Sequence, residues 1–317
     1  MKIVVMEPLG ISKEKLGLLA QPFIQAGDEF VAYNDRATDE QQLIARIADA
    51  DVVIVANQPL SGEVIAACSN LKLLSVAFTG VDHIALAACQ AKNITVCNAA
   101  GYSTNAVAEL TFGLAISVIR NIVPCDARCR SCGTKDGLVG FELYGKTFGV
   151  VGTGAIGSRV AQIARAFGCH VIASSRTEKP ELQAAGVEYV PLETLLQTAD
   201  FISLHVPLTE ATKNLIDDKA VALMKPGAVL LNTSRGPVID SEAVAAALND
   251  GRLGGAGIDV FENEPPIAAE HPLCGAKNAV LTPHVAFASR EALEKRAEIV
   301  FANISCWLEG KPQNVIK

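Results

Sequence analysis

The sequence predicts an α/β fold, built from parallel sheets that are covered by helices and divided between two domains. Short apolar runs alternate with helical patterns along the whole chain, which is typical of parallel strands joined by helices. Within each run the apolar residues occupy consecutive positions, as expected for strands that are covered on both faces. The length of 317 residues exceeds the size at which a single core usually stops growing, so we expect two domains.

The strand-like runs form two series on either side of a long helical pattern. The first series comprises residues 2–6, 29–33, 51–56, 71–78 and 95–98. Helical patterns such as 39–48 and 62–67 separate these runs. A long apolar helix is predicted over residues 103–121, with a polar, glycine-containing stretch at 128–140 after it. The second series comprises residues 147–152, 170–175, 201–206, 228–234, 255–260 and 279–284, and a final helix is predicted over 290–308.

The composition excludes several classes of function. Half of the residues are hydrophobic and the mean hydropathy is +0.30, which excludes a disordered chain. A net charge of −7 and an isoelectric point near 5.3 argue against nucleic acid or an anionic membrane as a partner. The sequence has no uncharged run of about 18 apolar residues, so we expect no membrane span. The apolar stretch near the N-terminus is also too short for a signal peptide.

The cysteines favour a reducing compartment. They are nine in number and mostly lie inside apolar runs, which predicts buried, reduced thiols and a cytoplasmic location. Three of them, Cys125, Cys129 and Cys132, have the spacing of an iron–sulfur cluster loop. No suitable fourth ligand lies adjacent, so we expect no metal. Iron analysis and the visible spectrum of anaerobically purified protein distinguish the two interpretations.

A glycine motif at residues 148–157 predicts a dinucleotide site. An apolar strand ends in G-x-G-x-x-G, and a helical pattern follows at once. Gly152 allows the tight turn, Gly154 lets the backbone approach a pyrophosphate, and Gly157 lets the helix pack close to the strand. The helix N-terminus then offers unpaired N–H groups and a positive dipole end to the anion.

The end of the next strand favours NADP(H) over NAD(H). A site for NAD usually carries Asp or Glu there, which binds the ribose 2′-hydroxyl. This chain instead reads Ser174, Ser175, Arg176, with no acid before Glu178. The arginine can bind a 2′-phosphate through two hydrogen bonds, and the serines can donate others. The alternative is that Arg176 stacks on the adenine and either cofactor binds.

Three later strands end abruptly in polar residues. Arg235 follows one strand, Asp259, Glu262 and Glu264 end another, and His284 ends a third. The carboxyl ends of parallel strands meet at one edge of the sheet, so these side chains are expected in the same crevice as the glycine turn. Together they predict a site for a carboxylate substrate with a proton donor.

The sequence resembles the D-isomer-specific 2-hydroxyacid dehydrogenase family over essentially the whole chain, with several motifs in the same order. The resemblance rests on five motifs, VGTGAIG at 151–157, SLHVPLT at 203–209, NTSRGP at 232–237, GIDVF at 257–261 and TPH at 282–284. It implies that Arg235 binds the substrate's carboxylate and carbonyl and that His284 is the acid/base. It also implies that Glu264, rather than Glu262, is the carboxylate partner of His284.

The resemblance implies further contacts with cofactor and substrate. Asp259 matches the acid that contacts the nicotinamide carboxamide. His205 matches a position that flanks the cofactor, and a structural role is the alternative for it. The loop at 74–82 matches the one whose amides bind the substrate carboxylate, which assigns Thr79 and Gly80 to that role. Tyr102 is expected to line the cleft. The complete cofactor-binding set is Gly152, Gly154, Ala155, Ile156, Gly157, Ser175, Arg176, His205, Val206, Pro207, Thr212, Thr233 and Asp259.

The resemblance also implies the domain organisation. A Rossmann-type cofactor domain of residues 101–286 interrupts a smaller, flavodoxin-like substrate domain made of residues 1–100 and 287–317. Family members are commonly dimers through the cofactor domain, so we expect a homodimer. The resemblance also implies that the region of residues 125–132 is a connector ahead of the strands of the cofactor domain.

The implied activity is hydride transfer between NAD(P)H and a small 2-oxo acid, giving the D-2-hydroxy acid. Residues 283–292 resemble the glycerate dehydrogenase and hydroxypyruvate reductase branch, so glyoxylate or hydroxypyruvate is the expected substrate. Phosphoglycerate and larger aromatic or branched 2-oxo acids are alternatives, although residues 56–58 lack the arginine typical of phosphoglycerate enzymes. A protein of a different class, an NAD(P)-sensing binding protein, would show no turnover with any 2-oxo acid.

Overall fold

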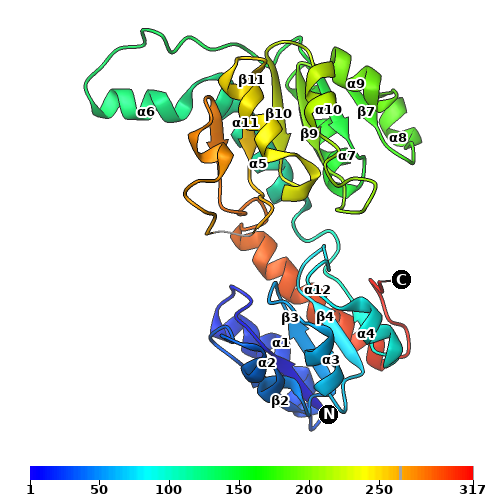
Figure 1. Ribbon diagram of the computed structural model, residues 1–317. Coiled ribbons are helices and arrows are strands. Elements are labelled where there is room, and N and C mark those ends of the chain that lie inside the picture. Colours follow the sequence, from blue (N-terminus) through cyan, green and yellow to red (C-terminus); the bar gives the residue numbers. More distant parts are fainter. Residues whose placement is uncertain (264–265, 317) are drawn as a thin grey trace. The chain divides into compact units, whose positions relative to one another are not determined.

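The chain forms two compact units in the computed structural model, which describes residues 1–263 and 266–316 (Figure 1). The first unit comprises Met1–Ser103 and Ala288–Lys317, and the second comprises Thr104–Phe287. The chain therefore leaves the first unit once and returns to it near the C-terminus.

The first unit contains a parallel sheet with the strand order β2-β1-β3-β4-β5. These strands are β1 (Lys2–Val5), β2 (Glu29–Ala32), β3 (Val52–Val55), β4 (Leu73–Val76) and β5 (Thr95–Cys97). Its helices are α1 (Lys13–Gln25), α2 (Glu40–Ile47), α3 (Gly62–Ala67), α4 (Leu86–Ala91) and α12 (Arg290–Leu308). Every residue of β3 and β4 is buried, as their consecutive apolar residues predict. The strand order reverses between β1 and β3, which is the doubly wound, flavodoxin-like arrangement.

Helix α12 joins the first unit through buried polar contacts as well as apolar ones. The hydroxyl of Ser75 in β4 donates to the carbonyl of Val300, at 3.1 Å. The side-chain amide of Asn303 donates to the carbonyl of Asn98, at 3.0 Å. Phe301 adds ring contacts with Phe23 and Phe30. The C-terminal helix is thus part of this unit's core.

The second unit contains a longer parallel sheet with the order β12-β11-β10-β9-β6-β7-β8. These strands are β6 (Thr147–Val151), β7 (His170–Ser174), β8 (Glu188–Tyr189), β9 (Phe201–Leu204), β10 (Ala228–Asn232), β11 (Leu253–Ile258) and β12 (Ala279–Leu281). Its helices are α5 (Thr104–Ile119), α6 (Ile122–Arg130), α7 (Ala155–Ala166), α8 (Pro180–Ala184), α9 (Leu192–Thr198), α10 (Asp218–Leu223) and α11 (Ser241–Asn249). The strand order reverses at β6, which lies between β7 and β9, so this crevice is the expected ligand site of a Rossmann-type sheet. The predicted fold class is confirmed.

The second unit has two clusters of buried apolar residues, and one of them contains the stacked rings of β6, β9 and α5. Phe148 of β6 stacks on Phe201 of β9 with ring centroids 5.7 Å apart, and Phe112 of α5 stacks on Phe148 at 5.4 Å. A Cβ atom added at Gly257 would lie 2.7 Å from the Cβ of Leu114. The glycine therefore allows α5 to lie directly against β11.

The strands of the second unit end before the polar residues that were predicted to end them. Strands β10, β11 and β12 stop at Asn232, Ile258 and Leu281, whereas the predicted runs extended to 234, 260 and 284. The residues beyond them form turns, and His284 has a left-handed φ of +54°. The polar side chains thus stand in turns just past the sheet rather than on the strands.

The segment after α5 differs from the prediction. Helix α6 follows α5 after a 60° bend, and Asn121 between them has a left-handed φ of +51°. Cys125 and Cys129 therefore lie on a helix, not in an irregular polar stretch. Together with the loop that follows, α6 extends away from the sheet as an arm of residues 122–139 (Figure 1).

Neither a single membrane-spanning helix nor a metal-binding cluster is found among the residues that the structure describes. Within 1–263 and 266–316, no single helix is long and apolar enough to cross a membrane, although the bent pair α5 and α6 meets the criteria of length and composition together. In the same residues no three His, Cys, Asp or Glu side chains are arranged to hold a metal ion.

Candidate functional site

The glycine turn of the second unit is shaped as a phosphate-binding turn. Gly152 has a left-handed φ of +90°, and a Cβ there would lie 2.5 Å from the carbonyl oxygen of His205. A Cβ at Gly157 would overlap the carbonyl oxygen of Gly152. At Gly154, by contrast, a Cβ would meet nothing within 4 Å, and no side chain caps the α7 helix that begins after it. The turn is tight where the protein packs against itself and open where an anion would approach.

A cavity of about 590 Å³ lies over this turn. It is lined by residues that end or follow β6 and β7 and by residues that follow β9, at the point where the strand order reverses. The lining comprises Val151, Gly152, Thr153, Gly154, Ser174, Ser175, Arg176, Thr177, Lys179, His205, Val206, Pro207, Thr209, Ala211 and Thr212. Hydroxyl groups and two cations provide its polar surface, and none of these lining residues is an Asp or a Glu.

His205 enters the cavity wall as a neutral imidazole. Its Nε2 lies 2.8 Å from the hydroxyl of Ser203, which is fully buried in β9. Burial lowers the pKa of His205 to about 3. The ring therefore carries no charge at neutral pH. The main-chain amide of His205 donates to the carbonyl of Val151, next to the glycine turn, at 2.8 Å.

Because of this shift, His205 makes the free energy of unfolding depend on pH. Its pKa rises from about 3 in the folded state to 6.5 in the unfolded state, so the unfolded state binds the extra proton and stability falls as the pH drops below about 6.5. Between pH 7 and pH 5, His205 is expected to remove about 2 kcal/mol of stability. In urea unfolding at both pH values, the His205→Gln variant should lose less stability than the wild type by this amount. Equal losses in the two proteins would contradict a neutral His205 with a lowered pKa.

Arg235 stands in a turn that is fixed by its neighbours. The side-chain oxygen of Asn232 accepts hydrogen bonds from the amide and hydroxyl of Ser234, at 3.0 and 2.8 Å. The Asn232 amide donates to the carbonyl of Arg235 at 2.9 Å. A Cβ at Gly236 would overlap the main chain of Phe261, so the turn packs directly on the segment after β11. Arg235 is half-buried at the carboxyl edge of the sheet.

His284 is held in place mainly by Asp259. Its amide donates to the Asp259 carbonyl at 2.7 Å. The fully buried Asp259 carboxylate accepts hydrogen bonds from the hydroxyl of Thr282 at 2.6 Å and from the amides of Val285 and Ala286 at 2.9 Å. Burial raises the pKa of Asp259 above its usual value, although these hydrogen bonds oppose the shift. The imidazole packs edge-on against Phe287, with ring centroids 5.6 Å apart.

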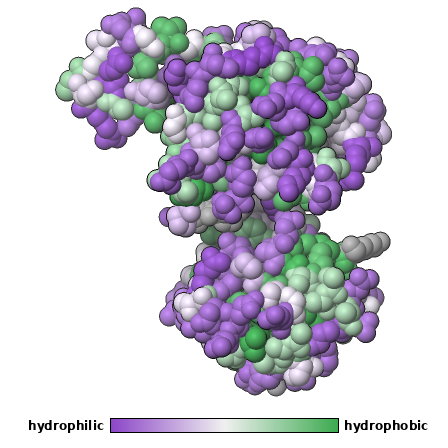
Figure 2. All heavy atoms as spheres, viewed as in Figure 1, coloured by the Kyte–Doolittle hydropathy of each residue, from purple (hydrophilic) through white to green (hydrophobic). Residues whose placement is uncertain are grey.

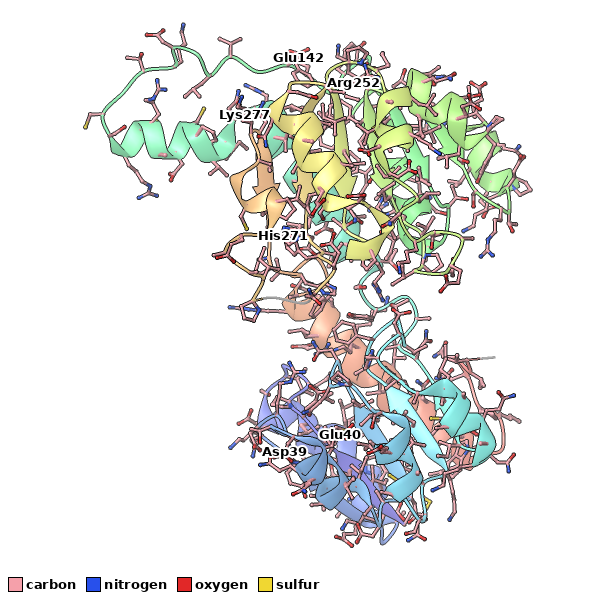
Figure 3. All side chains as sticks on the ribbon, viewed as in Figure 1. Asp39, Glu40, Glu142, Arg252, His271 and Lys277 are labelled. Carbon is pink, nitrogen blue, oxygen red and sulfur yellow. The ribbon has the colours of Figure 1, made fainter. Side chains whose placement is uncertain are left out.

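A second histidine, His271, lies in the segment between β11 and β12. The Nε2 atom of His271, which is labelled in Figure 3, is 2.9 Å from a carboxylate oxygen of Glu262. Burial raises the pKa of Glu262, but hydrogen bonds from Ser241 and His271 outweigh it and leave that pKa below its usual value. Glu262 is therefore occupied by partners other than His284. Glu264, the predicted catalytic carboxylate, lies outside the described residues.

In the first unit, the predicted substrate loop follows β4. The carbonyl of Thr79 accepts a hydrogen bond from the Asn98 side chain at 2.7 Å, which fixes the loop next to β5. Tyr102 is buried against Phe78, and the guanidinium of Arg296 lies over both rings. The roles of Thr79, Gly80 and Tyr102 in substrate binding stay predictions.

The predicted cofactor residues divide into three groups in the structure. Those that line the cavity are Gly152, Gly154, Ser175, Arg176, His205, Val206, Pro207 and Thr212. Ala155, Ile156 and Gly157 form the first turn of α7, directly after the lined turn. Thr233 contacts the hydroxyl of Thr111 in α5, at 3.1 Å, and Asp259 is enclosed by the turn that carries His284. These two lie outside the cavity lining.

Sequence reasoning assigned no role to several residues of the lining. Thr153, Thr177, Lys179, Thr209 and Ala211 belong to the cavity without having been predicted. For Lys179, its position three residues after Arg176 could have indicated a place in the cavity, because both residues follow the same strand.

The comparisons with known proteins agree with this geometry. Residues 112–286 match the model for the NAD binding domain of the D-isomer specific 2-hydroxyacid dehydrogenases. The chain is 41% identical to the glyoxylate reductase of Thermococcus litoralis over 285 residues, which cover 86% of either protein. It is 33% identical to the hydroxypyruvate reductase of Blautia hydrogenotrophica, over all of this chain and 99% of the relative. An acyclic imino acid reductase in complex with NADPH and D-Arg has a TM-score of 0.90 at 33% identity, with both chains covered completely.

The family model spans more than half of the chain, and the curated relatives exceed 30% identity along most of it. The predictions of family, enzyme class and nicotinamide cofactor are thereby confirmed. With a nucleotide turn and polar turns at one sheet edge, the chain belongs to the D-isomer specific 2-hydroxyacid dehydrogenase family and is an NAD(P)-dependent oxidoreductase.

Proposed function

We propose that the enzyme reduces glyoxylate or hydroxypyruvate to the D-2-hydroxy acid, with Arg235, His284 and Glu264 as the catalytic residues. The observation that carries this proposal is the placement of Arg235 and His284. Both stand in turns at the carboxyl edge of one sheet, after β10 and β12, with Asp259 after the strand between them. Relatives named glyoxylate reductase and hydroxypyruvate reductase support the choice of substrate.

The residues around the cavity fit a dinucleotide. Gly154 and the uncapped N-terminus of α7 offer an anion site, and the cavity lining carries two cations and no carboxylate. We assign the pyrophosphate to the glycine turn and the adenosine ribose to Ser175 and Arg176. The nicotinamide cofactor supplies the hydride when it is bound.

In the proposed reaction, Arg235 orients the 2-oxo acid through its carboxylate and carbonyl groups. Negative charge develops on the carbonyl oxygen as the hydride is transferred, and the guanidinium stabilises that charge. His284, entering as the imidazolium, donates its proton to the same oxygen. Glu264 is the proposed carboxylate that orients the imidazole, and Asp259 holds the main chain on which the imidazole stands.

We propose a preference for NADPH over NADH. Ser174, Ser175 and Arg176 occupy the place where an NAD site usually carries an acid. The next acid along the chain, Glu178, accepts a hydrogen bond from the Gln183 side chain at 2.8 Å and does not line the cavity. A relative that was solved with NADPH supports this preference.

A small, unphosphorylated substrate is favoured by the end of β3. Residues 56–58, where phosphoglycerate enzymes typically carry an arginine, contain none, and Gln58 among them is buried. Its amide group donates to the carbonyl of Ala37 and accepts from the amide of Ala37. Gln58 therefore serves the loop after β2 and offers no cation to a substrate phosphate.

The proposal is tested by a panel of 2-oxo acids assayed with NADH and NADPH in parallel. The highest kcat/KM is expected for glyoxylate or hydroxypyruvate with NADPH. Faster turnover of 3-phosphohydroxypyruvate or phenylpyruvate would replace the proposed substrate. Nucleotide binding without turnover of any 2-oxo acid would indicate a nucleotide-sensing protein instead.

We propose a homodimer that forms through the arm of residues 122–139. Its base is fixed because the Asn121 side chain donates to the Leu138 carbonyl at 3.3 Å. Apolar side chains are exposed on it, with Ile122 at 46%, Val123 at 58% and Val139 at 82%, and Figure 2 shows apolar spheres among the polar ones there. An arm with exposed apolar residues at its base fits a second copy of the same chain, since isologous pairing would cover both arms.

The Val139→Asp variant is therefore expected to dissociate. Light scattering after size exclusion should give a dimer for the wild type and a monomer for the variant, because a buried carboxylate at the interface would lack a partner. Leu18→Asp on α1, where the leucine is 66% exposed, is the matched control and should remain dimeric. A monomeric wild type, or a dimeric Val139→Asp variant, would contradict the proposed interface.

We further propose that the first unit is the substrate domain, that the second is the cofactor domain, and that the protein works in the cytoplasm. The nine cysteines are free thiols, and Cys68, Cys89, Cys97 and Cys169 are buried. Buried thiols without disulfides favour a reducing compartment.

A further inference from the structure

We propose that Lys179 is a second cation for the 2′-phosphate of NADPH and determines cofactor specificity together with Arg176. This inference rests on the proposed preference for NADPH. The residue was not predicted from the sequence, yet the structure places it in the wall of the cofactor cavity, within the segment that also carries Ser175 and Arg176.

The main chain of Lys179 is fixed by a tyrosine from the edge of the sheet. The amide of Lys179 donates to the hydroxyl of Tyr189 in β8, at 3.1 Å. That hydroxyl donates in turn to the side chain of Thr153 in the glycine turn, at 3.0 Å. The segment after β7 is thereby tied to the turn that receives the pyrophosphate.

The ammonium group is held at the same turn. Its Nζ atom donates to the hydroxyl of Ser158 at 3.0 Å, and that hydroxyl donates to the carbonyl of Thr153 at 3.0 Å. The ammonium has three donors, so a hydrogen bond to one neutral hydroxyl leaves capacity for an anion. Lys179 is half-buried, which reduces the entropy that is lost when it binds a ligand.

The charges around the cavity favour an additional anionic group on the ligand. Among its lining residues Arg176 and Lys179 are cations and His205 is neutral, whereas no carboxylate contributes. Glu178 lies between the two cations in the sequence but pairs with Gln183 on α8. A pyrophosphate already has the glycine turn and the N-terminus of α7, so two further cations in the segment after β7, which carries the proposed ribose site, match a 2′-phosphate.

The test separates the 2′-phosphate from the pyrophosphate by titrating two adenine nucleotides. Calorimetry with adenosine 2′,5′-bisphosphate and with ADP is performed on the wild type and on Lys179→Met, Lys179→Arg and Lys219→Met. Lys219 is an exposed lysine of α10 outside the cavity lining and serves as the matched control. NADPH and NADH are titrated in the same way.

Lys179→Met is expected to bind adenosine 2′,5′-bisphosphate and NADPH at least tenfold more weakly, because a charge-assisted hydrogen bond is lost. Its affinities for ADP and NADH should change less than about twofold, Lys179→Arg should retain most of the affinity, and Lys219→Met should match the wild type.

Equal losses for both nucleotides would place Lys179 at the pyrophosphate and overturn the proposal. Unchanged binding of adenosine 2′,5′-bisphosphate to Lys179→Met would overturn it as well, as would a wild type that binds ADP more tightly than the 2′,5′-bisphosphate. These titrations measure binding alone, so failure of the proposed 2-oxo acid reduction is detected separately, in the turnover assay of the wild type.

Discussion

Replacing His284 with glutamine is expected to lower kcat about 100- to 10,000-fold, the contribution typical of a general acid. Glutamine keeps a polar side chain of similar length but cannot donate a proton to the carbonyl oxygen. The measurement is steady-state reduction of glyoxylate and hydroxypyruvate with NADPH. Affinity for NADPH, determined by titration, should remain within about twofold of the wild type.

The control for this variant is another histidine in the same unit. His170 begins β7, is largely exposed and lies outside the cavity lining, so His170→Gln should keep wild-type activity. Turnover of His284→Gln within a few-fold of the wild type would show that the proton comes from another group. His271, paired with Glu262, would then be the next histidine to test.

Replacing Arg235 with glutamine is expected to reduce kcat/KM by about 100- to 1,000-fold, the loss seen when a group that stabilises a developing oxyanion is removed. KM for the 2-oxo acid should rise and kcat should fall, because the guanidinium is proposed to bind the carboxylate and to stabilise the transition state. The Asn232 side chain bonds the main chain at 234 and 235, so the turn is expected to keep its shape in the variant.

A lysine at position 235 distinguishes charge from geometry. Arg235→Lys keeps the positive charge but loses the planar pair of donors, so intermediate activity is expected. Arg159→Gln, on the exposed surface of α7, is the control and should be active. If Arg235→Gln retained kcat/KM within a few-fold of the wild type, the proposed substrate site would be wrong.

The sheets were predictable because their strands are apolar at consecutive positions. The runs that became β3, β4 and β6 are bounded by turn residues, and only their ends differ from the prediction. Helix α6 was not predicted, since its exposed residues show no apolar periodicity. A left-handed Asn121, a conformation that asparagine tolerates and most residues do not, separates it from α5.

The candidate site was predictable where its chemistry follows from a motif and not where it depends on contacts. The positions of the glycine turn, Arg235 and His284 could be predicted because these residues follow strands in a recognisable order. The hydrogen-bond partners of Asp259 could not be predicted. Its carboxylate bonds the main-chain amides of residues 285 and 286, and such partners leave no mark in the sequence. The same holds for Lys179, whose place depends on Ser158 and Tyr189.

The return of the chain through α12 has a consequence for how this protein can be divided. The hydrogen bonds of Ser75 and Asn303 make α12 part of the first unit's interior, so the second unit is an insertion between β5 and α12. A stop codon near residue 288 would remove the helix that covers β4. It would therefore destabilise the first unit, although most of that unit lies at the N-terminal end of the chain. The uninterrupted stretch Thr104–Phe287, by contrast, is the piece that can be transplanted as a single segment.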